Sequence, residues 1–255
     1  MKNTYRMSFP IIDWDFNDNG QLKNTFVHNK DSFGGIAFDK DEKDMYIKSN
    51  VLLKKEIEGV DIPVKIHARN NNSKGVIMII GESPVRDTRK INDNGLYIGT
   101  PFAVACKDII PTQCKIYKNI FRILLEKDYD VYITDAVKIW HNDLKKKDFK
   151  NNINRGLLSL ERKNINPILT VAWGKTAIYA CENVLQLEDE KEYLPQTHPV
   201  KLNWDRWKVK MLTDAIKNNN KIGLDYVNTD NPDDSNFLAQ FIAEEILNKA
   251  KGAGL

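Results

Sequence analysis

The spacing of hydrophobic residues predicts alternating strands and helices from residue 76 onwards. The segment 76–80 is a short, continuous apolar run, as in a strand that is buried on both faces, and 130–134 and 167–173 are predicted as a second and a third strand. Four segments instead repeat their apolar residues at helical spacing: 116–125, 153–160, 174–187 and 237–246. A further strand is expected at 221–227. Alternating strands and helices indicate an α/β fold, in which helices cover both faces of a mostly parallel sheet.

The predicted architecture is a three-layer αβα sandwich around a central, mostly parallel, four-stranded sheet. In such sheets ligands bind beyond the carboxyl ends of the strands. Residues that directly follow the strands are therefore the first candidates for chemistry.

Residues 1–70 follow a different pattern. Short apolar or aromatic runs at 25–27, 35–38 and 45–47 are separated by turn-rich pieces, which is typical of hairpins. A polar stretch at 70–74 ends this part. We expect an N-terminal extension of β-hairpins over 1–70 and an α/β domain over 71–255.

Composition narrows the class of protein. The net charge of +3 and the isoelectric point of about 8.5 permit nucleic-acid binding without requiring it. Cys106, Cys114 and Cys181 form no CxxC pair, so neither a disulfide framework nor a four-cysteine metal or cluster site is expected. No apolar run is long enough for a signal peptide or a transmembrane helix. We expect a cytoplasmic protein with no membrane association.

Three polar side chains lie where the predicted strands end or in a later turn. Glu82 follows the strand at 76–80, Asp135 follows the strand at 130–134, and His198 lies in the turn before Trp204. Taken singly, Glu82 could cap a loop or helix, and His198 could be a structural hydrogen-bonding residue. Three such groups on loops of one sheet favour a functional site over these separate structural roles.

Five segments resemble motifs of uracil-DNA glycosylases, in the order of that family and over about residues 76–205. The likeness is to the iron–sulfur branch, whose first motif reads GExPG and whose last reads HPSxL. Gly81-Glu82-Ser83-Pro84 resembles GExPG, and HPVKL at 198–202 resembles HPSxL except at the serine. The other three similar segments are GTPFAVA at 99–105, DVYITDAVK at 130–138 and PILTVAWGKTA at 167–177. The resemblance implies that 71–255 form a uracil-DNA glycosylase-like domain.

The chain departs from the motifs of that family at several positions. Ile139 stands where the cluster-bearing branch has a cysteine, and the other ligand cysteines are also missing. No iron–sulfur cluster is therefore expected, and no metal or organic cofactor. Val85 replaces the second glycine of GExPG, and Ser83 stands where GQDPY members have the aspartate that activates water. Glu82 is then the first candidate for that task, with Asp87 in reserve.

The resemblance implies roles for several residues. A base within a duplex must be flipped out before it can be read and cleaved. Phe102 would stack on the flipped base, although a plain core aromatic is an equally good interpretation, and Leu202 would fill the gap as an apolar wedge. His198 would stabilise the charge that develops on the departing base, and Glu82 would orient water. Three nearby cations could hold phosphates or be simply solvated: Lys201, Arg206 and Lys208.

Asp135 carries the most specific expectation. The family generally has an asparagine there, which both accepts from and donates to uracil, whereas an ionised aspartate only accepts. Asp135 would disfavour uracil O4 and favour an exocyclic amino group such as that of cytosine. Val85 replaces the tyrosine with which GQDPY members exclude 5-substituents. Cytosine or a 5-modified cytosine, as in foreign or phage DNA, is therefore a candidate base, unless Asp135 simply bonds a neighbouring loop and uracil still enters.

These observations predict a monomeric, monofunctional DNA glycosylase, with a role in base excision, DNA repair or defence against foreign DNA. The alternative is a catalytically inactive relative that binds DNA or a protein partner, as the missing serine and cluster cysteines would allow. A nucleotide-binding enzyme of another kind has less support, because 95–99 match neither GxGxxG nor a P-loop.

Overall fold

The computed structural model describes a set of ranges that covers most of the chain after residue 58. These are 12–16, 22–23, 59–61, 63–68, 72–83, 97–99, 101–103, 114–140, 146–153, 155–188, 191–199, 204–218 and 235–253. The strand expected at 221–227 and the apolar runs at 25–27, 35–38 and 45–47 lie outside the described residues.

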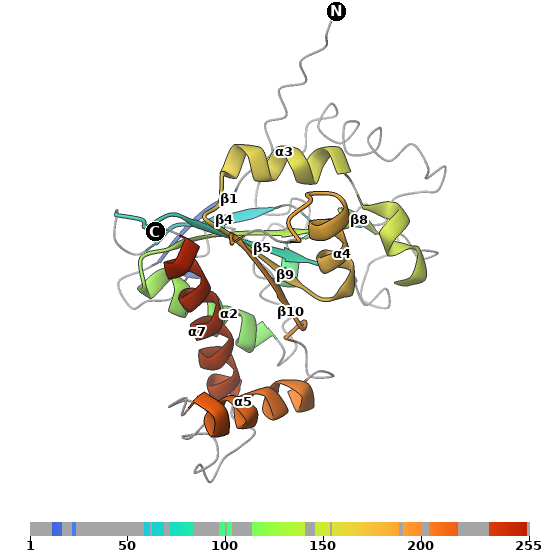
Figure 1. Ribbon diagram of the computed structural model, residues 1–255. Coiled ribbons are helices and arrows are strands. Elements are labelled where there is room, and N and C mark those ends of the chain that lie inside the picture. The colour runs from blue at the N-terminus through green and yellow to red at the C-terminus, as the bar shows by residue number, and fades with distance from the viewer. Residues whose placement is uncertain are drawn as a thin grey trace, which may run out of the picture.

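A central sheet organises the molecule (Figure 1). Four strands run parallel in the order β10 (Tyr193–Gln196), β9 (Leu169–Trp173), β5 (Val76–Gly81) and β7 (Asp130–Asp135). The segments predicted as strands at 76–80, 130–134 and 167–173 therefore correspond to β5, β7 and β9, which confirms the predicted mostly parallel sheet.

The described sheet is wider than expected. β4 (Val64–Ile66) pairs antiparallel with β7, β1 (Ile12–Phe16) pairs parallel with β4, and β2 (Leu22–Lys23) continues the order beyond β1. Strands that precede residue 71 thus extend the same sheet.

β10 was not predicted from the sequence. It is short and contains Pro195, which cannot donate to a strand ladder and is tolerated on an edge strand. Among the described strands, β10 pairs with β9 alone and forms that edge.

Helices cover both faces of the sheet (Figure 1). One face packs against α2 (Cys114–Glu126) and α7 (Ser235–Ala253), and the other against η4 (Lys146–Asn152), α3 (Arg155–Ile165) and α4 (Lys175–Asn183). α5 (Trp204–Asn218) packs against α7. The predicted three-layer αβα arrangement is confirmed.

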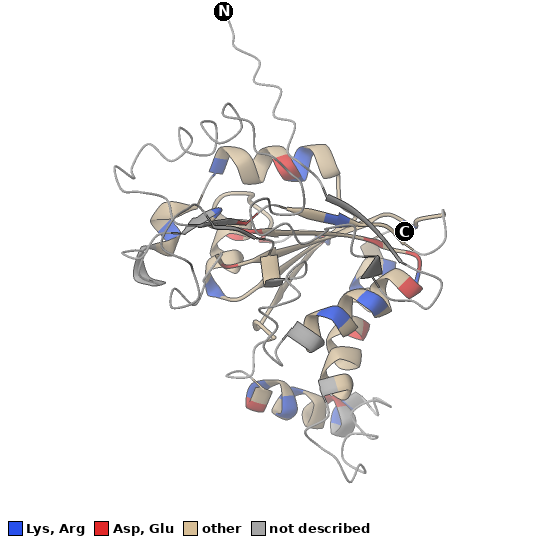
Figure 2. Cartoon of the chain, turned by 180° about the vertical axis from the view of Figure 1, so that it is seen from behind, with Lys and Arg blue, Asp and Glu red and all other residues tan. Residues whose placement is uncertain are grey.

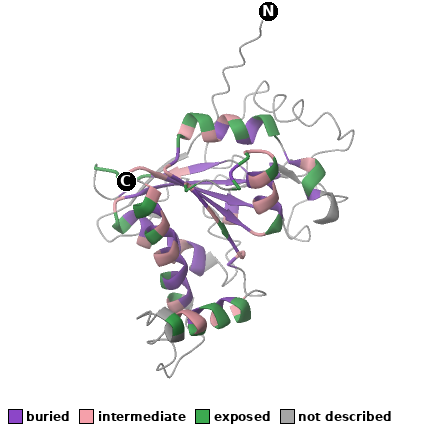
Figure 3. Ribbon diagram, in the orientation of Figure 1, coloured by how far each residue is buried: buried purple, intermediate pink, exposed green. Residues whose placement is uncertain are grey.

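The alternation of side chains along β5 explains why its apolar run is unbroken. Ile77 and Ile79 enter the core beneath α2 and α7, whereas Met78 and Ile80 enter the core beneath α3 and α4. All four side chains are fully buried, and Figure 3 shows the strands of the central sheet largely in purple, the colour of buried residues. A strand between two helical layers needs apolar residues at every position.

A second, three-stranded sheet lies beside the carboxyl ends of the main strands. It contains β6 (Tyr97–Gly99), β3 (Gly59–Asp61) and β8 (Ile139–Trp140), with β3 in the middle. β6 leads to the turn η3 (Pro101–Ala103), and β8 follows β7 after a short loop. β3 therefore ties together the two segments that carry Phe102 and Asp135.

Within the described residues, no helix is both long enough and apolar enough to span a membrane.

The thiol of Cys181 provides a test of how α4 packs. Cys181 is fully buried, and this burial, followed by the nearby Glu182 carboxylate, raises the pKa of its thiol from 9.0 to about 12. Because the thiolate is the reactive form, native Cys106→Ser/Cys114→Ser protein should react with a disulfide reagent at pH 8 at least about a hundredfold more slowly than the same variant in urea. Equal rates in the folded and unfolded protein would contradict this packing.

Candidate functional site

The carboxyl ends of β5 and β7 meet at Gly81 and Asp135, which are partners in the parallel register. A Cβ atom at position 81 would collide with Asp135 Oδ1 and would lie 2.8 Å from Phe102 Cζ. The missing side chain therefore lets a carboxylate and an aromatic ring converge on the end of β5. Asp135 is only 3% exposed.

The loop that carries Asp135 is fixed to the loop that carries Glu82. The Ala136 and Val137 amides donate to the carbonyl oxygens of Gly81 and Glu82, at 2.9 and 3.0 Å. These bonds extend the pairing of β5 and β7 beyond the last strand residues. The two loops form one connected rim at this edge of the sheet.

Phe102 adopts a backbone conformation that is rare for a residue with a side chain. Its φ of 56° and ψ of 18° lie in the left-handed region, where such residues are uncommon and cluster at functional sites. Aromatic neighbours hold the ring: its centroid lies 4.8 Å from that of Tyr117, 5.2 Å from that of Trp173 and 5.7 Å from that of His198. We call Phe102, Tyr117, Trp173 and His198 the aromatic wall.

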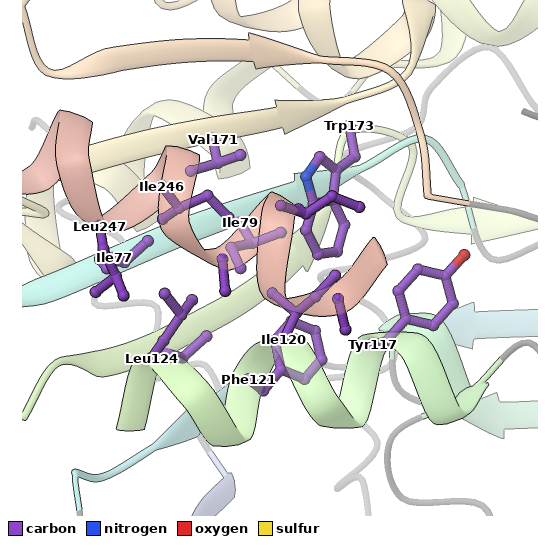
Figure 4. Close-up of a cluster of buried hydrophobic side chains, with 14 of the residues drawn as sticks. Ile77, Ile79, Tyr117, Ile120, Phe121, Leu124, Val171, Trp173, Ile246 and Leu247 are labelled. Atoms are coloured by element: carbon purple, nitrogen blue, oxygen red, sulfur yellow. The ribbon is translucent and has the colours of Figure 1, made fainter. Parts of the chain in front are cut away.

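Two members of this wall lie at one end of the apolar core (Figure 4). Tyr117 comes from the first turns of α2, and Trp173 is the last residue of β9. In the figure, the Tyr117 hydroxyl points away from the isoleucines and leucines that fill the rest of the cluster. The wall therefore combines a buried apolar side with polar atoms at the edge of the sheet.

His198 follows β10 by two residues and is partly buried. Its Nδ1 atom lies 3.4 Å from the Tyr117 hydroxyl, a long hydrogen bond whose direction depends on the tautomer of the ring. The imidazole also packs at 5.7 Å from Phe102 and 6.4 Å from Trp173, between ring centroids. His198 therefore belongs to the same cluster as the proposed stacking residue.

Glu82 reaches across to the start of α4. Its Oε1 atom accepts a hydrogen bond of 3.0 Å from the Thr176 amide in the first turn of that helix. Gly174 makes room for it: a Cβ there would lie 2.8 Å from Glu82 Cδ, and its φ of +93° also favours glycine. The helix-capping interaction considered for Glu82 is thus present, and it places the carboxylate beside the residue that follows Trp173.

A buried ion pair between Lys138 and Glu161 attaches the segment that carries Asp135 to α3. Lys138 Nζ lies 2.8 Å from each carboxylate oxygen of Glu161 on α3, and the Thr134 hydroxyl donates to the same carboxylate at 2.8 Å. Lys138 also donates to Thr134. The side chains of this ion pair are at most 1% exposed, so Lys138 has a structural role. Thr134 and Lys138, which lie on either side of Asp135 in the sequence, are both held by Glu161.

The remaining candidate residues are spread more widely. The Ser83 hydroxyl is buried and has no hydrogen-bond partner among the described residues. Arg206 is exposed and Lys208 partly exposed on α5. Val85, Asp87, Lys201 and Leu202 lie outside the described residues. The structure thus brings Phe102 together with Asp135 and His198, and it places Glu82 and Ser83 on the adjoining loop after β5, at the same edge of the sheet.

The sequence patterns did not indicate that Tyr117, Trp173 and the Lys138–Glu161 pair belong to this site. In the sequence, Tyr117 is one more apolar position of an amphipathic helix, and Glu161 resembles any charged residue of a helix. Trp173 offered the best signal, because a tryptophan directly before a glycine at a strand end places a large ring at the ligand-binding edge. Among the described residues, no cluster of three or more His, Cys, Asp or Glu side chains could hold a metal ion.

Comparison with known families identifies one match. Residues 69–219 match the sequence model of the uracil DNA glycosylase superfamily. A search of curated proteins gives no significant match. The matched region contains each of the five residues that converge at the edge of the sheet.

The buried ion pair makes a prediction about stability. Lys138→Met leaves the Glu161 carboxylate buried without its cation, so the free energy of unfolding in urea should fall by about 3–5 kcal/mol. Adding Glu161→Gln should restore much of this loss, because the amide can still accept from Thr134. Lys74→Met, which removes an exposed pair with Asp128, should change stability by less than about 1 kcal/mol. A Lys138→Met protein as stable as the wild type would contradict the assigned role.

Proposed function

Since the chain belongs to the uracil DNA glycosylase superfamily, a family of DNA glycosylases, we propose that it hydrolyses the N-glycosidic bond of a flipped-out pyrimidine and leaves an abasic site. The observation that carries this proposal is the convergence of Glu82, Asp135, Phe102 and His198 at the carboxyl edge of one sheet. An extruded base needs an aromatic surface, a reader of its polar edge and a group that stabilises its departure. These side chains are of the required types.

Phe102 provides the surface on which the base stacks. Its ring tip lies in the space that a Cβ atom at Gly81 would need, and aromatic neighbours that include Tyr117, Trp173 and His198 restrict its motion. A stacking ring that is already ordered loses little entropy when a ligand binds. The strained backbone of Phe102 agrees with a residue that is held in place for function.

His198 stabilises the negative charge that develops on the departing base. When the Tyr117 hydroxyl donates to Nδ1, the proton of a neutral imidazole resides on Nε2. Nε2 then donates a hydrogen bond to a base oxygen, and this bond strengthens as the glycosidic bond breaks. Tyr117 is thus a positioning residue for His198.

Glu82 and Ser83 act on the sugar side. The bond from Thr176 holds Glu82 through Oε1, and the Ser83 hydroxyl, which has no described partner, can bind water beside it. Glu82 orients that water and offsets the positive charge that develops on the sugar. Water adds to the anomeric carbon, the base leaves with the bonding electron pair, and the proton of water passes to the carboxylate.

Asp135 reads the polar edge of the base. Its carboxylate is buried beside Gly81 and Phe102, where an ionised group accepts hydrogen bonds only. An exocyclic amino group therefore suits it better than a carbonyl oxygen. We infer cytosine or a 5-modified cytosine as the preferred base, as would be expected for an enzyme directed at foreign DNA.

The DNA strand itself would lie along α5 and the segment before it. Figure 2 shows basic positions in blue along this helix, and Arg206 and Lys208 on it are our candidates for phosphate contacts. Lys201 and Leu202 precede it in sequence, as a phosphate-binding residue and a wedge for the vacated stack. This placement makes the carboxyl edge of the sheet and α5 one DNA-binding side.

The glycosylase proposal predicts loss of activity at two residues. Duplex and single-stranded oligonucleotides that carry uracil, cytosine, 5-methylcytosine or 5-hydroxymethylcytosine are incubated with protein, and abasic sites are cleaved with alkali. Glu82→Gln and His198→Ala should each lower the single-turnover rate about a hundredfold or more. Glu126→Gln and His67→Ala, which lie away from the site, should keep the wild-type rate. No abasic product from any wild-type reaction, beside an active control glycosylase, would refute the proposal and favour an inactive DNA-binding protein.

Base preference gives an independent prediction about Asp135. Asp135→Asn restores a side chain that both accepts and donates, so the ratio of uracil to cytosine-type excision rates should rise about tenfold or more. The ratio of the two rates is measured on otherwise identical oligonucleotides. An unchanged ratio would show that Asp135 does not read the base.

A further inference from the structure

A chain of buried and partly buried hydrogen bonds connects the aromatic wall to the outer helices. The Trp173 indole Nε1–H donates to Gln196 Oε1 at 2.8 Å, and Gln196 Nε2 donates to Glu245 Oε2 on α7 at 3.1 Å. Glu245 in turn pairs with Lys210 on α5. We call these four residues the relay. Trp173 is fully buried and Gln196 is 4% exposed.

The relay has only one workable arrangement of donors and acceptors. An indole nitrogen can only donate, and an ionised carboxylate can only accept. The Gln196 amide must therefore present its oxygen to Trp173 and its nitrogen to Glu245, since the flipped amide would lose both bonds. Both partners thus determine the orientation of one buried side chain.

The inner end of the relay touches the proposed catalytic groups. The Trp173 ring lies 5.2 Å from Phe102 and 6.4 Å from His198, between ring centroids. Gln196 is the residue of β10 that pairs with Trp173, its carbonyl accepts from the Gly174 amide at 3.1 Å, and the chain reaches His198 two residues later. A displacement of Gln196 would therefore move both the stacking wall and the histidine.

The outer end lies on the helix proposed to face DNA. Lys210 Nζ sits 5.4 Å from the Trp207 ring centroid and 6.0 Å from that of Phe241, as well as on Glu245. These contacts fix α5 to α7 at the same point where the relay begins. One polar chain thus runs from α5 through α7 and β10 to Trp173.

We propose that Gln196 is a positioning residue, and that the Lys210–Glu245–Gln196–Trp173 relay sets the placement of Phe102 and His198 relative to α5. This inference rests on the proposed glycosylase function. It predicts that the polarity of the hydrogen bonds at Gln196 controls the excision step, and that the affinity for DNA depends on it little.

Exchanging the donor and the acceptor of the bond between Gln196 and Glu245 tests this polarity. Gln196→Glu keeps the shape and the acceptor for Trp173 but places a second carboxylate against Glu245. The double variant Gln196→Glu/Glu245→Gln reverses donor and acceptor: residue 245 now donates, residue 196 accepts from both sides, and the amide oxygen at 245 can still accept from Lys210. Glu126→Gln, which loses an exposed pair with Arg122, is the matched control for loss of a helical glutamate.

Single-turnover excision is measured at pH 8 on the oligonucleotide that the wild-type protein cleaves fastest, with the rate expressed per folded molecule. Gln196→Glu should lower the rate about tenfold or more, and the double variant should return it to within about threefold of wild type. The Kd for duplex DNA with a tetrahydrofuran abasic analogue should change by less than about twofold in both, since that binding does not need the relay. Glu126→Gln should match the wild type in both measurements.

Two results would overturn the proposed role of the relay. One is a wild-type excision rate in Gln196→Glu, and the other is a double variant that folds but excises the base about tenfold or more slowly than the wild type. If Gln196→Glu does not fold, the rate of the double variant still decides. If the wild-type protein cleaves none of the oligonucleotides, NMR chemical shifts test the relay separately from the glycosylase proposal. The Trp173 indole and His198 ring resonances should then shift in Gln196→Glu and return in the double variant, and an unshifted His198 resonance would exclude the relay.

Discussion

The absence of a side chain at Gly81 is the constraint on which the rest of the site depends. The parallel register places Asp135 directly beside this residue, and Phe102 reaches it from the turn η3, further along the chain. Any Cβ atom there would force the carboxylate and the ring apart. Because the Phe102 ring contacts Tyr117, Trp173 and His198, a substitution of Gly81 that moves this ring would also disturb the other members of the aromatic wall.

The protein stabilises the acidic groups around this point in different ways. Glu161 is neutralised by Lys138 in a pair that water does not reach, whereas Glu82 is held by an amide in the first turn of α4. Burying a charge requires a partner of this kind. The effect is that the loops on both sides of Asp135 are anchored to helices, while its own carboxylate faces Gly81 and Phe102. Rigid support of this kind suits the role in base recognition that we propose for Asp135.

Much of the fold follows from local sequence patterns, and parts of the site do not. Segments rich in apolar residues indicated β5, β7 and β9, because strands covered on both faces bury most of their side chains. Glu82 and Asp135 lie at the ends of β5 and β7, whereas His198 came from the HPVKL segment and follows β10. β10 was missed because Pro195 breaks the pattern of a strand. The bond between Glu82 and Thr176 spans 94 positions, and the Thr134–Glu161 bond spans 27. Such partners are set by the packing of helices on the sheet, which periodicity along the chain does not encode.

Glu82 shows why a structural and a catalytic interpretation of one residue need not compete. A glutamate on a loop has several rotatable bonds, and a free side chain would lose much conformational entropy each time it oriented a water molecule. The bond from Thr176 to Oε1 imposes that order during folding. A helix N-terminus also favours a negatively charged group, so the first turn of α4 is a suitable anchor for this side chain. In the mechanism that we propose, the capping interaction is therefore what positions the Glu82 carboxylate.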